Sequence, residues 1–417
     1  MAMKNVFIVT TFKIYEGNSA GSARLMNIAK ALVSEKVRVF LCSAVLSDSM
    51  DLTNVREISR NIFLVGRENK KQWSFLQKVH KRFFIFFITA VFVRNIHKLI
   101  KEVSDEKVIY FYPDLFSMDV LVLVYLKYFR GYSVYADINE MRRVIVFNRV
   151  YSRKILKKLY QLLSFVLYYF KSYIGEIMAK YFDGIIVIST SIEKYFNKYN
   201  KNILHVPILA DCSKIDVFVP PKINNGKFMI GFAGILASKK EGFEYFYQSL
   251  SMVKNHFSNF QLNLYGPIYE PYERELLLNI LPLKYGLVEN INYGGYIEQK
   301  NIIDVLRKHH LLVLPRPLTP QTHYGFSTKL SEYLVSGVPV FVTDVSDNGL
   351  FIKDQENGFI VKPGNPDEYA KKILFIIRNY DNIVEKISIN ALETAKKFFY
   401  YENYRLPLTN FLSNESH

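Results

Sequence analysis

The segment His309–Asp344 constrains the fold more than any other part of this 417-residue chain. It begins with an apolar run and ends with a second one, Val338–Val342, and each run predicts a buried strand. The residues between them predict a loop and then a helix that begins at Ser327 or Thr328, because hydroxyl side chains cap the first backbone N–H groups of helices. Gly337 ends that helix. A strand–helix–strand unit of this kind indicates an α/β fold.

Two charged residues in this helix suggest a ligand. Lys329 falls in the first turn, where a cation opposes the helix dipole unless an anion is bound there. Glu332 lies about one turn further along, where a carboxylate can accept hydrogen bonds from two sugar hydroxyls. A phosphate and a ribose at one helix end indicate a nucleotide. The alternative is an α/β unit that binds no ligand.

Strand-like runs alternate with helical patterns through the rest of the chain, which predicts parallel sheets with crossover helices. The length fits two domains. We expect a domain over residues 1–211, a linker rich in Pro and Lys over 212–227, a second domain over 228–390 and a final helix over 391–417. Two cysteines far apart argue against a disulfide framework or a zinc site, and fit a reducing cytoplasm.

The segment Gly325–Val340 resembles the donor-binding signature of the family 4 retaining glycosyltransferases, in a form typical of polysaccharide and lipopolysaccharide transferases. Many members have two glutamates that flank seven residues. This chain has Glu332 at the second position and Tyr324 at the first, so the family's sugar-contacting glutamate is absent. The resemblance implies a GT-B fold, an α/β architecture in which two Rossmann-like domains with parallel sheets face a central cleft. It also implies that the last helix crosses back to the first domain.

The resemblance further implies which residues bind a nucleotide-sugar donor. Two are in the glycine-rich turn after the first predicted strand, where a simple chain reversal is the alternative. Others follow the strand Phe228–Gly234; the family's arginine there is replaced by Ile235, which leaves Lys240, or Lys239, to bind the diphosphate. The full set of expected donor contacts is Gly21, Ser22, Gly234, Lys240, Tyr296 beside the nucleobase, Arg316 as a substitute guanidinium, Tyr324, Gly325, Phe326, Ser327, Thr328, Lys329, Leu330 and Glu332.

Two carboxylates follow the predicted strand Ser133–Ala136, at the strand edge where α/β folds bind ligands. Family members carry a polar pair here, near the reacting sugar, so Asp137 and Glu140 are the candidate catalytic residues. The alternative is that they cap the next helix.

Positive charge is concentrated in the first half of the chain. Residues 1–200 contain 31 Lys and Arg against 16 Asp and Glu, whereas residues 201–417 contain 23 against 22. Basic residues surround apolar runs over Lys70–Lys101 and Arg142–Lys180. These runs are too short to span a bilayer but suit helices that lie on an anionic membrane surface. Core helices with solvated basic edges are the alternative. No nucleic-acid-binding motif accompanies the charge, so we expect no nucleic-acid partner.

The sequence therefore predicts a glycosyltransferase that moves a sugar from a nucleotide-sugar donor to a saccharide or lipid-linked saccharide acceptor in cell-surface glycan synthesis, with retention of configuration. We expect no cofactor and no metal, and a cytoplasmic location at the inner face of the cell membrane. The alternatives are another GT-B enzyme, such as a sugar-nucleotide epimerase or an inverting transferase, and a non-catalytic basic protein that binds membranes.

Overall fold

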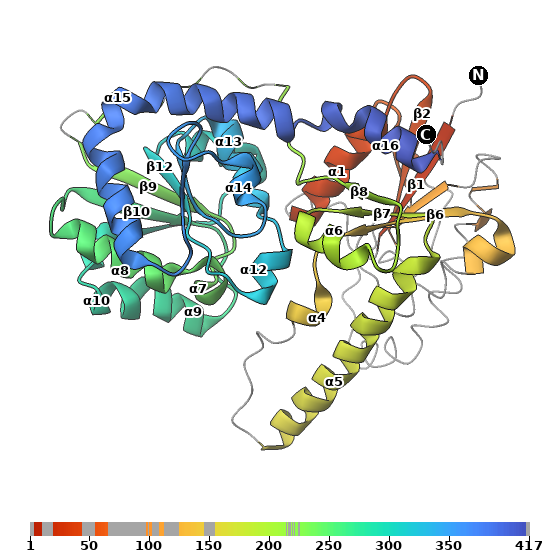
Figure 1. Ribbon diagram of the computed structural model, residues 1–417, viewed down its shortest axis with the longest axis horizontal. Coiled ribbons are helices and arrows are strands. Elements are labelled where there is room, and N and C mark those ends of the chain that lie inside the picture. Colours follow the sequence, from red (N-terminus) through yellow and green to blue (C-terminus); the bar gives the residue numbers. More distant parts are fainter. Residues whose placement is uncertain are drawn as a thin grey trace. The chain divides into compact units, whose positions relative to one another are not determined.

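The computed structural model describes residues 4–10, 20–43, 55–65, 97–98, 100–101, 108–111, 125–145, 155–213, 215, 218, 220, 222–223 and 226–413. The chain forms two compact units. The first comprises Met1–Val206 together with Tyr401–His417, and the second comprises Pro207–Tyr400. Each unit contains a sheet with helices packed on it, as the alternating pattern predicts (Figure 1).

The sheet of the first unit is parallel except at one edge, where β3 runs antiparallel to β4. Its strands, in spatial order, are β3 (Val55–Ser59), β4 (Ile62–Val65), β2 (Val37–Ser43), β1 (Lys4–Thr10), β5 (Val108–Phe111), β6 (Ser133–Ile138), β7 (Gly184–Val187) and β8 (Ile203–His205). Its main described helices are α1 (Ala20–Leu32), α4 (Arg142–Ile145), α5 (Ile155–Met178), α6 (Thr190–Phe196) and α16 (Arg405–Leu412). Apolar residues of β1, β2 and β7 are almost fully buried and form the centre of the core.

The sheet of the second unit is parallel throughout. Its strands, in spatial order, are β11 (Ile291–Gly295), β10 (Phe260–Tyr265), β9 (Phe228–Ala233), β12 (Leu311–Leu314), β13 (Val340–Thr343) and β14 (Phe359–Val361). This is the order 3-2-1-4-5-6 of the Rossmann fold, in which the direction of strand addition reverses between the first and fourth strands. Such folds bind ligands at that reversal, here the carboxyl ends of β9 and β12.

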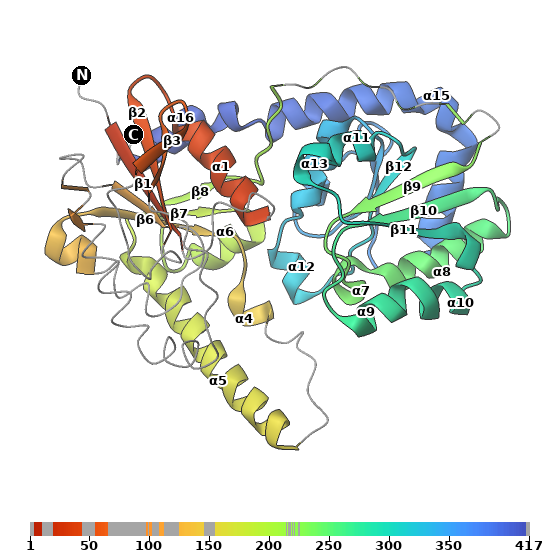
Figure 2. The same cartoon turned by 180° about the vertical axis from the view of Figure 1, so that it is seen from behind.

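Helices cover both faces of this second sheet. The helices α11 (Ile302–Leu306) and α13 (Thr328–Ser336) lie on one face, and α8 (Phe243–Lys254), α9 (Pro271–Glu275) and α10 (Leu281–Lys284) lie on the other, as Figure 1 and Figure 2 show from opposite sides. The long helix α15 (Pro366–Phe398) packs against both α8 and α13.

The structure differs from the predicted boundaries in three places. The final helix expected over 391–417 is instead the end of α15, a short 3₁₀ turn (Tyr401–Tyr404) and α16 over the described residues. At the C-cap of α15, the carbonyl of Phe399 accepts a hydrogen bond from the backbone N–H of Ala210, at 2.7 Å. The helix α1 begins at Ala20, so the expected glycine-rich loop contributes its last residues to the first turn of that helix. Finally, β6 extends to Ile138.

Candidate functional site

The helix α13 confirms the prediction made from its sequence. It begins at Thr328 with Ser327 as the N-cap, and it ends at Gly337, whose φ of 76° is the left-handed conformation that favours glycine. The apolar stripe of the helix, formed by Leu330, Tyr333 and Leu334, is fully buried. The expected side-chain cap, however, is not formed: Ser327 is 3% exposed, and its Oγ has no hydrogen-bond partner among the residues that the structure describes. Buried polar atoms normally have a partner, so this hydroxyl is available to a ligand.

One tyrosine fixes α13 against the end of β9. The Tyr333 hydroxyl accepts a hydrogen bond from the backbone N–H of Ala233 at 2.8 Å and donates one to the carbonyl oxygen of Ala233 at 3.3 Å. Because Ala233 is the last residue of β9, these bonds place the first turn of α13 beside the loop that follows the strand. Lys329, in that first turn, is 7% exposed and lies at this junction.

A buried cluster of charges occupies the junction. Glu241, the last residue of α7 (Ser238–Glu241), is 1% exposed and accepts two hydrogen bonds from Arg316, from Nε and Nη2, both at 3.0 Å. Its Oε1 also accepts a hydrogen bond from Nζ of Lys329 at 3.0 Å. The Lys329 ammonium lies 5.0 Å from the centre of the Phe232 ring, a favourable cation–π arrangement. The two cations thus share one carboxylate.

The electrostatics of this cluster follow from burial and proximity. Burial disfavours the charged form of Glu241, but Arg316 and Lys329 outweigh it and hold the pKa of the carboxyl well below its ordinary value. Burial also lowers the pKa of Lys329 to about 8, because the attraction of Glu241 compensates only in part and Arg316 repels the ammonium. Lys240 acts on both groups through its charge. Two cations and one anion leave the buried trio net positive.

Glu332 lies on the same helix and is half-buried. Its Oε1 accepts a hydrogen bond from Nε2 of Gln299 at 2.8 Å, and burial raises the pKa of its carboxyl. Gln299 begins a short 3₁₀ turn soon after β11. Tyr296, at the end of β11, leaves 56% of its surface exposed. The loop after β11 therefore supplies both an exposed aromatic ring and a partner for Glu332.

The structure brings several of the expected donor contacts together and gives others a packing role. Gly234, Arg316 and Lys329 meet at the carboxyl ends of β9 and β12. Phe326, in contrast, packs its ring against Phe351 and Phe399, so its side chain belongs to the core. Leu330 is fully buried, and Tyr324 and Gly325 form the end of the short helix α12 (Pro320–Tyr324) and its C-cap. Glu241 was missed by the sequence reasoning, because a glutamate beside two lysines reads as a solvated surface.

The predicted catalytic pair of the first unit is divided by the structure. Asp137 is fully buried inside β6, where it forms an ion pair of 2.9 Å with Nη2 of Arg24 and accepts a hydrogen bond from the Tyr110 hydroxyl. These partners argue for a structural role. Glu140 lies beyond the strand and forms a partly exposed ion pair of 3.4 Å with Arg142. Ser22, in the first turn of α1, is buried, and the adjoining Gly21 is half-buried.

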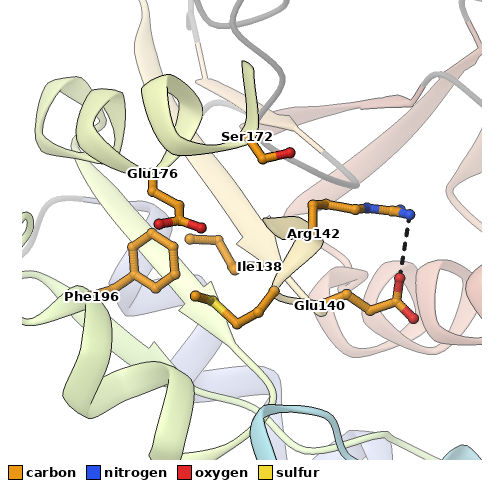
Figure 3. Close-up of a pocket in the computed structure, with 7 residues that line it drawn as sticks. Ile138, Glu140, Arg142, Ser172, Glu176 and Phe196 are labelled. Carbon is orange, nitrogen blue, oxygen red and sulfur yellow. Dashed lines mark ion pairs between the residues drawn. The ribbon is translucent and has the colours of Figure 1, made fainter. Parts of the chain in front are cut away.

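Glu140 lines a pocket of the first unit with about 280 Å³ of empty space, part of it open to solvent. Figure 3 shows side chains from the end of β6, from α5 and from α6 around it. Ser172 is 2% exposed, and its Oγ has no hydrogen-bond partner in the described part of the chain. The lining residues are Ile138, Glu140, Met141, Arg142, Ser172, Glu176 and Phe196. The pocket thus combines carboxylates, a guanidinium and a hydroxyl with apolar walls.

Two features are absent from the part of the chain that the structure describes. No cluster of three or more His, Cys, Asp or Glu side chains suited to a metal ion occurs among them. Nor does any helix in the described part of the chain combine the length and the apolar character needed to cross a membrane. Most of the segment Lys70–Lys101, one of the two expected membrane-facing stretches, lies outside the described residues.

The second unit is similar in sequence to known glycosyltransferases. Residues 213–394 match the family model of the glycosyl transferases group 1. An uncharacterized glycosyltransferase of Methanocaldococcus jannaschii is 26% identical over 149 residues, which cover 36% of this chain and 39% of the relative. The chain thus matches about two fifths of the length of that curated relative.

Solved structures resemble the whole chain in fold. Sucrose-phosphate synthase from Thermosynechococcus elongatus superposes with a TM-score of 0.70 at 14% identity, covering 99% of each chain. Anabaena HepE in complex with UDP gives 0.65 at 14% identity, covering 99% of this chain and 100% of HepE. Both likenesses establish the fold. The chain therefore has the GT-B fold, and its residues 213–394 match the model of the glycosyl transferases group 1 family.

Proposed function

We propose that this chain is a glycosyltransferase that transfers a sugar from a nucleotide-sugar donor to a saccharide or lipid-linked saccharide acceptor, with retention of configuration. The observation that carries the proposal is the buried pair of cations, Arg316 and Lys329, at the strand ends where Rossmann-like folds bind nucleotides. It stands in a domain whose family consists of glycosyl transferases.

The chemistry of the reaction explains why cations are needed there. When the bond between sugar and nucleotide breaks, the nucleoside diphosphate leaves with developing negative charge, which fixed donors and cations stabilise. The ammonium of Lys329, the guanidinium of Arg316 and the backbone N–H groups of the first turn of α13 would provide this. These groups supply positive charge from the protein itself, so we propose that the transfer is metal-independent.

Other contacts fit the remaining parts of a nucleotide. In this proposal the half-buried carboxylate of Glu332 accepts hydrogen bonds from the ribose hydroxyls, with Gln299 holding it in place. The exposed ring of Tyr296 contacts the base. The hydroxyl of Ser327, which has no partner among the described residues, donates to a phosphate oxygen. The UDP in the HepE structure is one nucleotide of this shape.

The first unit is the proposed acceptor domain. Of the two predicted carboxylates, Glu140 is the candidate for contact with the reacting sugar, because it lines a pocket, whereas Asp137 is enclosed by Arg24 and Tyr110. We further propose that this unit docks on the anionic inner face of the cell membrane, in cell-surface glycan synthesis. The support is the excess of basic residues before residue 200 and the exposed apolar side chains of α5.

Two measurements test the proposed function. Isothermal titration of the purified chain with UDP, GDP and ADP should reveal binding of at least one, and a Lys329→Met variant that remains folded should bind it more weakly. Incubation with a panel of nucleotide sugars should then release the matching nucleotide, with the anomer of the product assigned by NMR. No binding of any nucleotide would overturn the donor site, and an epimerised sugar still attached to its nucleotide would indicate the other enzyme class.

A further inference from the structure

The carboxylate of Glu241 has no place in the chemistry of sugar transfer described above, although it lies at the centre of the proposed donor site. An anion beside a diphosphate site repels the ligand, so its presence needs a compensating benefit. Glu241 is 1% exposed, and its carboxylate accepts hydrogen bonds from three donors of the described residues, all on cations: Nε and Nη2 of Arg316 and Nζ of Lys329, each at 3.0 Å.

We propose that Glu241 is a positioning residue of the donor site, whose carboxylate holds the guanidinium of Arg316 and the ammonium of Lys329 side by side, ready to bind the diphosphate of the nucleotide sugar. The inference rests on the proposed function and deepens it. Arg316 follows β12 and Lys329 lies in the first turn of α13, so the two cations come from different segments and repel each other. A shared carboxylate between them removes that repulsion and fixes both side chains.

The geometry leaves donors for the ligand. A guanidinium has five N–H donors and an ammonium has three. Glu241 engages two donors of Arg316 and one of Lys329. The remaining donors, together with the net positive charge of the trio, are sufficient for bidentate contacts to phosphate oxygens. Glu241 therefore organises the cations without saturating them.

The backbone around Glu241 and Arg316 also supports a positioning role for Glu241. Glu241 is followed by Gly242, where φ is 76° and an added Cβ would lie 2.1 Å from the carbonyl oxygen of Pro315. This close approach brings the end of α7 against the residue that precedes Arg316. The carbonyl of Arg316 in turn accepts a hydrogen bond of 2.6 Å from the Thr343 hydroxyl, which fixes its backbone. Both ends of the Glu241–Arg316 pair are thus held by the fold.

Glu241 also affects the charge state of Lys329. The groups that act on the Lys329 ammonium are Glu241, Arg316 and Lys240, and the Glu332 carboxyl faces it from the next turn of α13. Burial, Arg316 and Lys240 all favour the neutral amine, and Glu241 opposes them. Removal of the Glu241 charge would therefore move the deprotonation of Lys329 to lower pH.

The test is nucleotide affinity as a function of pH in Glu241→Gln, using whichever of UDP, GDP and ADP binds the wild-type chain most tightly. We expect affinity at pH 7 to fall about 10- to 100-fold, the range for loss of a charged hydrogen bond. Deprotonation of Lys329 removes positive charge from the site, so affinity should fall as pH rises. We expect this fall to begin at lower pH in Glu241→Gln than in the wild type. The matched control is Glu244→Gln, on α8. The exposed carboxylate of Glu244 pairs with Lys284, so its loss should change neither the affinity at pH 7 nor the pH at which affinity begins to fall.

The outcomes separate the inference from the proposed function. If the wild-type chain binds none of the three nucleotides, the donor site is overturned. If it binds one and Glu241→Gln has the same affinity and pH profile, this inference alone is overturned, as it is by a uniform loss of affinity without a pH shift. Should Glu241→Gln fail to fold, Glu241→Asp is the second variant, because it keeps the negative charge on a shorter side chain. Weaker nucleotide binding that still falls at the same alkaline pH as in the wild type supports the inference. Unchanged affinity contradicts it.

Discussion

The backbone of Gly234 lies directly against the side chain of Lys329. A Cβ added at residue 234 would come within 1.9 Å of Cε and 2.9 Å of Nζ of Lys329. The φ of Gly234 is 149°, a conformation that other residues rarely adopt. Glycine at this position therefore lets the lysine cross the end of β9 and reach Glu241. The position of one cation thus depends on the absence of a single methyl group.

Gly234→Ala should consequently weaken nucleotide binding. The new methyl group displaces Lys329, and we expect affinity to fall by about tenfold or more, as for loss of a charged hydrogen bond. Isothermal titration measures the affinity and thermal unfolding the stability. The matched control is Gly286→Ala: Gly286 also has positive φ, at 66°, but no atom lies within 4 Å of an added Cβ. Equal affinity in the two variants would show that Lys329 does not contact the nucleotide.

Nucleotide affinity should fall as pH rises through about 8. Burial lowers the pKa of Lys329 to about 8 in the free protein, whereas a bound diphosphate favours the protonated form. Above this pH, binding must therefore be accompanied by proton uptake. Titration calorimetry at pH 8.5 in two buffers of different ionisation enthalpy measures that uptake. The expected difference between the buffers should vanish in Lys329→Met; its persistence there would assign the proton to another group.

Glu332→Gln should weaken nucleotide binding by about 1–3 kcal/mol, the cost of losing a charged hydrogen bond. Burial raises the pKa of Glu332, so in the wild type affinity should also decrease as pH falls through the raised pKa, where the carboxylate becomes protonated and loses an acceptor. The variant should lack this acid limb. Glu298→Gln, which removes an exposed carboxylate paired with Lys300, serves as the control. An unchanged affinity in Glu332→Gln would remove this residue from the ribose.

Asp137→Asn should lower stability. Removal of one member of a buried ion pair costs about 3–5 kcal/mol, because the remaining charge stays uncompensated. Here that charge is Arg24, which is 1% exposed and also donates to the carbonyl of Val206 at 3.2 Å. Denaturant unfolding should therefore show a large loss for Asp137→Asn and a small one for Glu140→Gln. Similar stability of the two variants would contradict a structural role for Asp137.

The sequence predicted those features that local patterns determine. The sequence of α13 contains an N-cap residue, apolar residues at helical spacing and a terminal glycine. Its predicted start at Ser327 or Thr328 and its end at Gly337 are confirmed. The central strand β9 (Phe228–Ala233) was likewise predicted, over Phe228–Gly234, from a short apolar run. Each of these sequence patterns spans about ten residues. The contacts with distant segments stabilise the same helix or strand that the pattern predicts.

The features that the sequence did not predict depend on contacts between distant segments. The pairing of Glu241 with Arg316 joins residues 75 positions apart, and that of Arg24 with Asp137 joins residues 113 apart. No local pattern distinguishes such a buried charge from a solvated one. Asp137 was expected after its strand, but β6 continues through it because Asp137 pairs in register with Ile186 of β7. Neighbouring strands, rather than the local sequence, set that boundary.

The final prediction concerns the helix α5. On this helix several large apolar side chains, among them Leu167 and Phe170, leave 58% and 56% of their surface exposed, and Lys171 beside them is exposed as well. An amphipathic helix with aromatic and basic residues binds at the interface of anionic membranes. The purified chain should therefore float with vesicles that contain phosphatidylglycerol, less so with neutral ones, and less as salt increases.

The double variant Leu167→Glu with Phe170→Glu should lower this binding about tenfold or more, since each fully buried side chain of this size contributes about 1.5–3 kcal/mol. Leu283→Glu is the matched control, because Leu283 is 75% exposed on α10 of the second unit. Nucleotide affinity should be the same in all three proteins, as the substitutions lie outside the donor site. Unchanged flotation of the double variant would exclude α5 as the membrane contact, and equal flotation with neutral vesicles would show that the basic residues do not select the surface.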